Sequence, residues 1–499
     1  MTAVANRVYS AAQVRELDRI AIEKHSVSGY GLMCRAGQAV FDSIRESWRD
    51  AKSLCVLCGG GNNGGDGYVV ACLALQAGWQ VQVISLADVS QLRGEAQQAY
   101  QAFVQYGGQV QPFTDTLPDA DVMVDALFGI GLDRVVEGTY AAAIHLLNQH
   151  TAPIVAVDIP SGLHADVGQP CGCAVAADMT VTFIAWKTGL LTGKARDYCG
   201  RVFLARLEVP EAVYEQVPTT YRLLGHHTVQ EALPSRPRSA HKGNCGHSLL
   251  IGGAQGMSGA VRLAGEAALR AGSGLVTVAT HSEHAPVLNL LRPELMVSAV
   301  ESPVHLRPLL QRMTAIGIGP GMGQSAWARG LLMMVQTAPQ PKVLDADALN
   351  LLAQSLLQDE NWILTPHPGE AARLLGCEVW AVEQDRVSAV QRLQRQYGGV
   401  VVLKGAGTLV ACADGIAFCP AGNPGMASGG MGDTLTGIIT GLLAQELSLQ
   451  AAAEVGVWIH AYAGDLAARG GERGLLASDL IAWIRQAMQE ASAPGHKTL

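Results

Sequence analysis

The first half of the chain alternates short apolar segments with longer amphipathic ones. Residues 10–48 carry Val14, Leu17, Ile20 and Ala21 at helical spacing, which predicts two helices. Short apolar runs typical of buried strands follow at 53–58, 81–86, 122–127, 154–157 and 179–184, with helical stretches between most of them. Alternation of this kind predicts a parallel, doubly wound sheet.

A stretch rich in proline, residues 208–240, separates this half from a second one with a similar pattern. Apolar strands at 249–251 and 275–279 flank a helix of small residues at 260–271. Further apolar strands lead into the polar or glycine-rich ends of the segments 315–323, 342–350, 362–370 and 400–408. We therefore predict two α/β domains, 1–218 and 241–499, joined by a linker at 219–240.

Composition is that of a well-buried globular protein, with 49% hydrophobic and 16% charged residues. The net charge of −8 and the lack of a Lys/Arg cluster argue against nucleic acid or an anionic membrane as a partner. The start of the chain lacks a basic segment followed by an apolar core, and no apolar stretch reaches the length of a membrane span. We expect a cytoplasmic protein whose eleven cysteines are reduced, because no pair has the spacing of a zinc site.

The stretch Asn423–Gly437 holds the most informative motif of the second half. Its glycines leave backbone N–H groups bare at the start of an apolar helix, an arrangement that suits a phosphate. Asp433 is a carboxylate among these amides, so we predict that it takes a proton from an attacking hydroxyl rather than only capping the helix. The motif Gly430-Met431-Gly432-Asp433 resembles that of the ribokinase superfamily.

A second glycine-rich segment, 59–67, follows the first apolar strand and precedes a helix expected from Tyr68 to about Ala77. Gly59, Gly61 and Gly64 match the dinucleotide-binding pattern G-x-G-x-x-G, and Asp88 lies 24 residues past Gly64. That match alone would suggest a dehydrogenase. The polar side chains inserted in the turn argue against a pyrophosphate lying flat there.

Polar residues also gather at the ends of the neighbouring strands. In a parallel sheet, Asn63, Asp125, Asp158 and Ser161 can converge on one crevice. An amide, a hydroxyl and one carboxylate favour a monovalent cation, which leaves Asp158 as the candidate acid or base. Asp125 could equally be a buried residue that caps a turn.

The motifs NNGGDG, DIPSGLHADVG and KTGLLTGKA together resemble the NAD(P)H-hydrate epimerase domain, which implies a Rossmann-like fold for the first half. The resemblance implies that Asn63, Asp125 and Ser161 hold K⁺. For Lys187, substrate contact and an exposed loop position remain alternatives. The residues implied to bind the hydrated nicotinamide nucleotide are Asn62, Asn63, Gly64, Gly65, Asp66, Gly129, Ile130, Gly131, Leu132, Asp133, Arg134, Val135 and Asp158.

Polar groups collect at strand ends in the second half as well. Pro368 suits the first position of a helix, so we expect His367 to point from the preceding loop into the crevice, with a helix-capping role as the alternative. Lys404 beside two glycines suits a nucleotide phosphate better than a surface position. Asp345 and Asp347 are either structural or help to organise a metal.

These segments resemble, in order, the ADP- or ATP-dependent NAD(P)H-hydrate dehydratases, which implies a ribokinase-like fold for the second half. The implied reaction transfers a phosphoryl group from ADP, with Mg²⁺, to the C6 hydroxyl of the hydrate, and loss of phosphate then restores NADH or NADPH. The residues implied to contact the hydrate are Ala260, Gly321, His367 and Asp433, and those implied to hold the nucleotide are Lys404, Gly405, Ala406, Gly407, Thr408 and Gly432.

We therefore predict a metabolite repair enzyme that epimerises the R and S hydrates and dehydrates the S form, and we expect a homo-oligomer. Two alternatives stay open. The second half could phosphorylate a vitamin or sugar precursor, or the first half could be a nucleotide-binding or dimerisation module without activity.

Overall fold

The computed structural model describes residues 6–25 and 27–492, so the predicted domain ends at 1 and 499 lie outside the described residues. The chain divides into two compact units, Met1–Arg222 (unit 1) and Leu223–Leu499 (unit 2). The predicted linker, 219–240, contains the strand β10 (Tyr221–Leu223) and the helix α8 (His226–Ala232). None of the helices in the described ranges has the length and apolar character needed to cross a bilayer.

Unit 1 is built on a seven-stranded parallel sheet of order β4-β3-β2-β5-β6-β7-β9. Outside this sheet, β1 pairs antiparallel with β10 and parallel with β8. The strands of unit 1 besides β10 are β1 (Arg7–Tyr9), β2 (Ser53–Cys58), β3 (Gln80–Ser85), β4 (Val110–Pro112), β5 (Val122–Ala126), β6 (Ile154–Val157), β7 (Met179–Phe183), β8 (Trp186–Lys187) and β9 (Arg201–Ala205). The helices are α1 (Ala11–Lys24), α2 (Gly29–Ser47), α3 (Asn62–Gln76), α4 (Gly94–Gln105), α5 (Gly138–Gln149), α6 (Ala195–Tyr198) and α7 (Glu211–Glu215).

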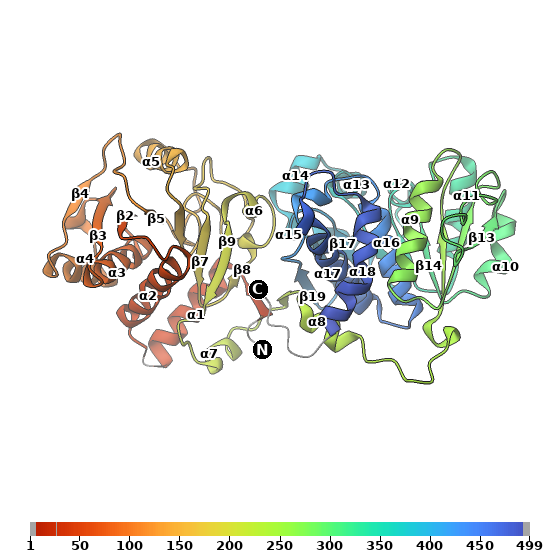
Figure 1. Ribbon diagram of the computed structural model, residues 1–499, viewed down its shortest axis with the longest axis horizontal. Coiled ribbons are helices and arrows are strands. Elements are labelled where there is room, and N and C mark those ends of the chain that lie inside the picture. The colour runs from red at the N-terminus through yellow and green to blue at the C-terminus, as the bar shows by residue number, and fades with distance from the viewer. Residues whose placement is uncertain (1–5, 26, 493–499) are drawn as a thin grey trace. The chain divides into compact units, whose positions relative to one another are not determined.

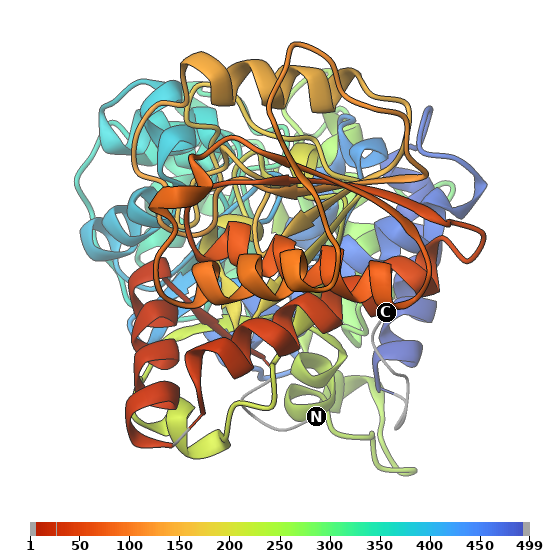
Figure 2. The same ribbon diagram turned by 90° about the vertical axis from the view of Figure 1, so that its left-hand side faces the viewer.

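Helices cover both faces of this sheet because both faces of its central strands are apolar. Val56 and Val124 pack into a core shared with α2 and α3, whereas Leu57 and Met123 pack into a core shared with α5. In Figure 2, α3 and α4 lie on one side of the sheet and α5 lies on the other. The predicted doubly wound sheet is confirmed, and the strand order reverses between β2 and β5, where such sheets bind their ligands.

The start of α3 differs from the prediction, which placed 59–67 in a loop and began the helix at Tyr68. The helix begins at Asn62, with Gly61 as its N-cap. Its glycines allow close packing: a side chain on Gly64 would meet the carbonyl oxygen of Gly59 at 2.1 Å, and one on Gly67 would meet Cβ of Ala126 at 2.6 Å. Tertiary packing thus outweighs the low helix propensity of glycine.

Unit 2 contains a sheet of order β13-β12-β11-β14-β15-β16-β17-β18-β19, in which all neighbours from β13 to β17 are parallel. Its strands are β11 (His247–Ile251), β12 (Leu275–Thr280), β13 (Met296–Ala299), β14 (Ala315–Ile318), β15 (Lys342–Leu344), β16 (Trp362–Leu364), β17 (Val400–Leu403), β18 (Leu409–Cys412) and β19 (Gly415–Phe418). Its helices besides α8 are α9 (Ser258–Arg270), α10 (Arg307–Leu310), α11 (Ala326–Gln336), α12 (Asp347–Leu352), α13 (Pro368–Leu375), α14 (Val379–Gln384), α15 (Arg386–Tyr397), α16 (Met431–Ala444), α17 (Leu449–Ala467) and α18 (Ala477–Ser492).

The helices α9, α16, α17 and α18 pack against one another in unit 2 (Figure 1). The central one, α16, is buried along nearly its whole length from Met431 to Ala444. Close packing is possible because Gly437 and Gly441 lie against the backbone of Ala264 and Ala268 in α9. The buried helix predicted to follow the glycine-rich motif is therefore confirmed, and its N-terminus reaches the carboxyl edge of the sheet beside Asp345 and Lys404.

Candidate active sites

Unit 1 contains a cavity of about 830 Å³ at the point where the strand order reverses. Its walls come from α1, the first turn of α3, the loop after β5, and the residues Asp158 and Lys187. Of the predicted substrate residues, those that line this cavity are Asn62, Asn63, Asp66, Gly129, Ile130, Gly131, Leu132, Asp133, Arg134 and Asp158.

Three predicted substrate residues have other surroundings. Gly64 packs on the backbone of Gly59, and Gly65 packs on Met33 of α2. Val135 is 60% exposed. Within the described chain, these residues are not part of the cavity wall, so the glycines serve the packing of α3.

Asp158 is held in an unusual backbone conformation at the end of β6. Its φ angle is 66°, in the left-handed region, and its residue exposure is only 8%. Its Oδ1 accepts hydrogen bonds from the Phe183 N–H at 3.0 Å, from the Thr182 hydroxyl at 3.2 Å and from Lys187 Nζ. The hydrogen bonds given by described residues all fall on Oδ1, which leaves Oδ2 available to a ligand.

Lys187 is fully buried, which excludes the exposed loop position that the sequence left open. Besides pairing with Asp158, its Nζ donates to the Thr182 hydroxyl and to the Phe183 carbonyl, both at 2.8 Å. Burial lowers the pKa of Lys187, although Asp158 opposes this shift. Lys187 and Asp158 are therefore two buried titratable side chains in direct contact, an arrangement typical of sites that transfer protons.

Two further carboxylates that line the same cavity have raised pKa values. Burial raises the pKa of Asp66 far above its usual range, and Asp158 adds to this shift. Burial and Glu95 likewise raise the pKa of Asp18. Sequence reasoning missed Asp18 because a polar residue on an amphipathic helix is usually on its solvent side.

The three residues predicted to hold a cation lie around the loop after β5. Asp125 is fully buried and its carboxylate accepts N–H bonds from Ser161 at 2.7 Å and Leu127 at 3.3 Å, so it does cap a turn. The Ser161 hydroxyl accepts from the Phe128 N–H at 2.8 Å. The amide of Asn63 lies beside Gly129, and its buried nitrogen has no partner among the described residues.

Asp88, the candidate ribose-binding acid of the dinucleotide pattern, caps a turn. Asp88 is exposed and its carboxylate accepts the Ser90 N–H at 2.9 Å, at the start of a short 3₁₀ turn. It does not line the cavity of the described unit, so it has no role as a ribose-binding acid there.

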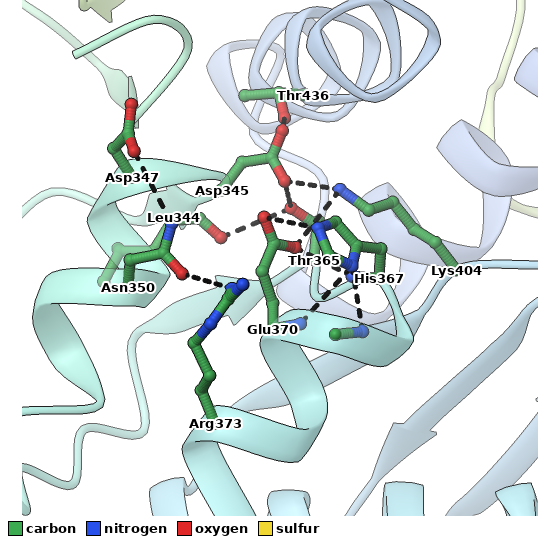
Figure 3. A network of polar contacts seen from close by, with 11 residues as sticks. Leu344, Asp345, Asp347, Asn350, Thr365, His367, Glu370, Arg373, Lys404 and Thr436 are labelled. Atoms are coloured by element: carbon green, nitrogen blue, oxygen red, sulfur yellow. Dashed lines mark hydrogen bonds and ion pairs between the residues drawn. The ribbon is translucent and has the colours of Figure 1, made fainter. Parts of the chain in front are cut away.

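In unit 2, a network of polar side chains lies at the ends of β15, β16 and β17 (Figure 3). Asp345 is its centre and is 1% exposed. Its Oδ1 accepts from Lys404 Nζ at 2.6 Å and from the Thr365 hydroxyl at 2.9 Å, and its Oδ2 accepts from the Thr436 hydroxyl at 2.8 Å. Burial opposes ionisation, but Lys404 and the threonines hold the pKa of Asp345 below its usual value. Both oxygens of Asp345 therefore serve the network, which favours the structural alternative.

Lys404 is not a surface lysine, since only 17% of its side chain is exposed. Its Nζ lies 3.9 Å from Oε2 of Glu370, and a side chain on Gly432 would meet it at 3.2 Å. Burial disfavours its charge, but Asp345 and Glu370 together raise the pKa of Lys404. A fixed cation thus lies beside the N-terminus of α16, which strengthens the anion site there.

Asp433 occupies the first turn of α16, whose N-cap is Gly430, and no described residue donates a hydrogen bond to the Asp433 carboxylate. The capping alternative therefore finds no support. Burial raises the pKa of Asp433 to about 6, with a further contribution from Asp345 and an opposing one from Lys404. A carboxyl group that ionises near pH 6 is suited to act as a general base near neutral pH.

His367 has the capping role that the sequence analysis gave as an alternative, and its contact with the substrate stays a prediction. Its Nδ1 accepts the N–H groups of Gly369 at 3.0 Å and Glu370 at 3.3 Å, which caps α13, with Pro368 at the first helical position as predicted. Its Nε2 lies 3.3 Å from Oε1 of Glu370, and half of the side chain is exposed. The local hydrogen bonds of the helix start fix this orientation.

The remaining predicted residues of unit 2 lie in three places. Gly321 lies against α9, where an added side chain would come within 3.1 Å of Ala260 Cβ. The segment Gly405–Thr408 follows β17, and the Thr408 hydroxyl closes it by donating to the Gly405 carbonyl at 3.0 Å. Asp347 accepts the Gly323 N–H at 2.7 Å and so joins the loops after β14 and β15.

Comparison with known proteins covers both units. Residues 248–486 match the family model described as NAD(P)H-hydrate dehydratase, and residues 29–189 match the one described as YjeF-related protein N-terminus. The chain is 51% identical to a bifunctional NAD(P)H-hydrate repair enzyme of Coxiella burnetii, over 96% of this chain and 98% of that one. It is 45% identical to the enzyme of the same description from Escherichia coli, over 97% of this chain and 94% of that one.

Two solved structures resemble the chain over about half its length. An ADP/ATP-dependent NAD(P)H-hydrate dehydratase from Bacillus subtilis, co-crystallised with ATP and Mg²⁺, has a TM-score of 0.50 and 32% identity over 54% of this chain and 97% of that one. A ribokinase-like superfamily protein from Enterococcus faecalis has a TM-score of 0.52 and 32% identity over 56% of this chain and 98% of that one.

Proposed function

The chain belongs to the bifunctional NAD(P)H-hydrate repair enzymes, and from this premise we propose which of its residues carry out the two reactions. It is an epimerase of hydrated NADH and NADPH and a nucleotide-dependent dehydratase of the same compounds. The predicted repair function is thus confirmed. The vitamin-kinase and inactive-module alternatives find no support, because the match extends over nearly the whole chain.

In the epimerase, Asp158 and Lys187 exchange protons with the hydroxyl at C6 of the hydrate. The C6–O bond breaks as its oxygen takes a proton and leaves as water, while the ring nitrogen shares its electron pair with C6. Water then adds to the other face of C6 and gives up a proton, so the two epimers interconvert without net change. The contact between a carboxylate and a buried lysine of lowered pKa supports this role.

A potassium ion fits Asn63, Asp125 and Ser161. The buried carboxylate of Asp125, whose pKa burial raises to about 6, is a group that a cation would stabilise, and the Asn63 amide and the Ser161 hydroxyl can add oxygen ligands. Oxygen donors with one negative charge suit a monovalent ion. When bound, the ion would supply positive charge beside the cavity loops.

In the dehydratase, Asp433 takes the proton of the C6 hydroxyl as that oxygen attacks the terminal phosphorus of the nucleotide. We propose ADP as the donor, so AMP is released and a phosphate ester forms at C6. Loss of phosphate from C6 and of a proton from C5 then restores NADH or NADPH. The single observation that carries this proposal is the partly buried carboxylate of Asp433 in the first turn of a helix, beside Lys404.

Lys404 and the N-terminus of α16 would stabilise the charge on the transferred group. The described residues contain no group of three His, Cys, Asp or Glu side chains placed to hold a metal. Magnesium would therefore bind mainly through the nucleotide phosphates, as it often does in phosphoryl transfer, and neutralise their charge.

The test is recovery of reduced-nicotinamide absorbance from a mixed R and S hydrate of NADH, with ADP, with ATP and with neither. Full recovery with ADP in K⁺ and Mg²⁺ supports the proposal. Recovery of only the S fraction would contradict the epimerase assignment, and recovery without nucleotide would contradict the phosphoryl mechanism. We also propose a cytoplasmic homo-oligomer, in keeping with eleven free cysteines, which light scattering and fractionation can check.

A further inference from the structure

Arg386, the first residue of α15, is a buried cation outside every motif considered above. It is 2% exposed. Its Nη1 pairs with Oε1 of Glu383 at 2.9 Å, and that glutamate is 39% exposed. Burying a guanidinium is costly, so its other hydrogen bonds indicate the role of Arg386.

Two of these bonds run to the end of β17, where the nucleotide segment begins. Nη2 donates to the carbonyl oxygens of Lys404 at 3.0 Å and Leu403 at 3.3 Å. The guanidinium also lies against the α-carbon of Gly405, where a side chain would meet its nitrogens at 3.0 and 3.1 Å. Gly405 has a φ of 134°, which a residue with a side chain rarely adopts.

The two peptide groups held by Arg386 differ at their N–H ends. A trans peptide directs its C=O and N–H to opposite sides. The Lys404 N–H, opposite the Leu403 carbonyl, is used within the protein by a bond to the Pro366 carbonyl at 2.9 Å. The Gly405 N–H, opposite the Lys404 carbonyl, has no acceptor among the described residues and lies in an exposed segment.

We propose that Arg386 is a positioning residue that orients the Lys404–Gly405 peptide, so that the Gly405 N–H donates to a phosphate of the nucleotide. The inference rests on the proposed dehydratase function and adds a component to it. The Lys404 side chain is fixed by Asp345 and its carbonyl by Arg386, so the adjacent residues Lys404 and Gly405 present a cation and a directed N–H to the same anion.

The test compares Arg386→Met and Arg386→Lys with the unaltered protein by calorimetric titration with ADP and by dehydratase kinetics. We expect Arg386→Met to weaken ADP binding and raise the KM for ADP at least tenfold, with a smaller loss in kcat. Arg386→Lys should weaken binding at least threefold, because an ammonium group cannot reproduce the spread of the guanidinium fork.

Lys342→Met is the matched control. Lys342 is also a cation 2% exposed in unit 2, paired with Asp359 at 2.9 Å, but it lies at the start of β15. Its loss should lower the melting temperature and leave ADP affinity within twofold. The inference is overturned if both Arg386 variants bind ADP within twofold of the unaltered protein. If the unaltered protein binds neither ADP nor ATP, the proposed function itself fails.

Discussion

Replacing Asp433 by asparagine should make unit 2 inactive and more stable at the same time. Burial raises the pKa of Asp433 from 3.8 to about 6, a shift of about two units. At about 1.4 kcal/mol per unit, the ionised group costs the folded state up to about 3 kcal/mol. Asparagine keeps the shape of the side chain and removes this charge.

The sign of the pH effect follows from the raised pKa. Between pH 4 and 6 the native protein holds a proton that the unfolded chain has lost, so stability falls as pH rises through this window. The cost is complete above about pH 7. Asp433→Asn should therefore raise the melting temperature of unit 2 by roughly 5 °C at pH 8 and have little effect at pH 4.

The dehydratase activity should depend on pH in the opposite direction to the stability. In the unaltered protein, kcat/KM for dehydration should rise with pH with a midpoint near 6, because the base must be ionised. Asp433→Asn should lower dehydration by about 10² to 10⁴-fold and leave epimerisation unchanged.

Scanning calorimetry at pH 8 and pH 4 measures the stability of unit 2, whose transition is the one that ADP shifts. Asp414→Asn, at an exposed turn of the same unit, serves as a control that should change nothing. The reasoning is refuted if Asp433→Asn is no more stable than the unaltered protein at pH 8, or if it dehydrates within tenfold of the normal rate.

Three further outcomes can be checked with single variants. Asp158→Asn should lower epimerisation by about 10² to 10⁴-fold and spare dehydration, so that only the S fraction of a mixed hydrate is recovered; loss of both activities in a folded protein would contradict separate sites. Lys404→Met should destabilise unit 2 by about 3 to 5 kcal/mol in urea unfolding, because Asp345 keeps a buried charge without its cation; an unchanged midpoint would contradict this. Asn63→Ala should raise the K⁺ concentration that gives half-maximal epimerase activity, and an unchanged K⁺ titration would remove Asn63 from the cation site.

The sequence predicted the buried strands well because each is a short apolar run between polar segments. Asp125 and Lys404 could also be placed correctly, since a polar residue at the end of such a run must lie at the carboxyl edge of a parallel sheet. Short or peripheral strands such as β8 (Trp186–Lys187) and β13 (Met296–Ala299) were missed, because a few residues with partial exposure carry little periodic signal.

Side-chain partnerships across long sequence separations were not predictable. Asp18 reaches the epimerase cavity from a helix that pattern analysis treats as having a solvent side. Lys187 pairs with Asp158 only because β7 brings the two together. Arg386 in an amphipathic helix likewise reads as a surface residue, although it is buried against the strand that ends at Leu403.

The left-handed backbone conformation at Asp158 limits which amino acids fit at this position. Glycine, asparagine and aspartate tolerate this conformation, and aspartate alone among them carries a carboxyl group. Glutamate, the customary conservative exchange, would strain the backbone and overreach Lys187. A lineage released from selection for epimerisation should therefore drift first to asparagine or glycine at this position, and such residues would identify relatives that have lost the activity while retaining the fold.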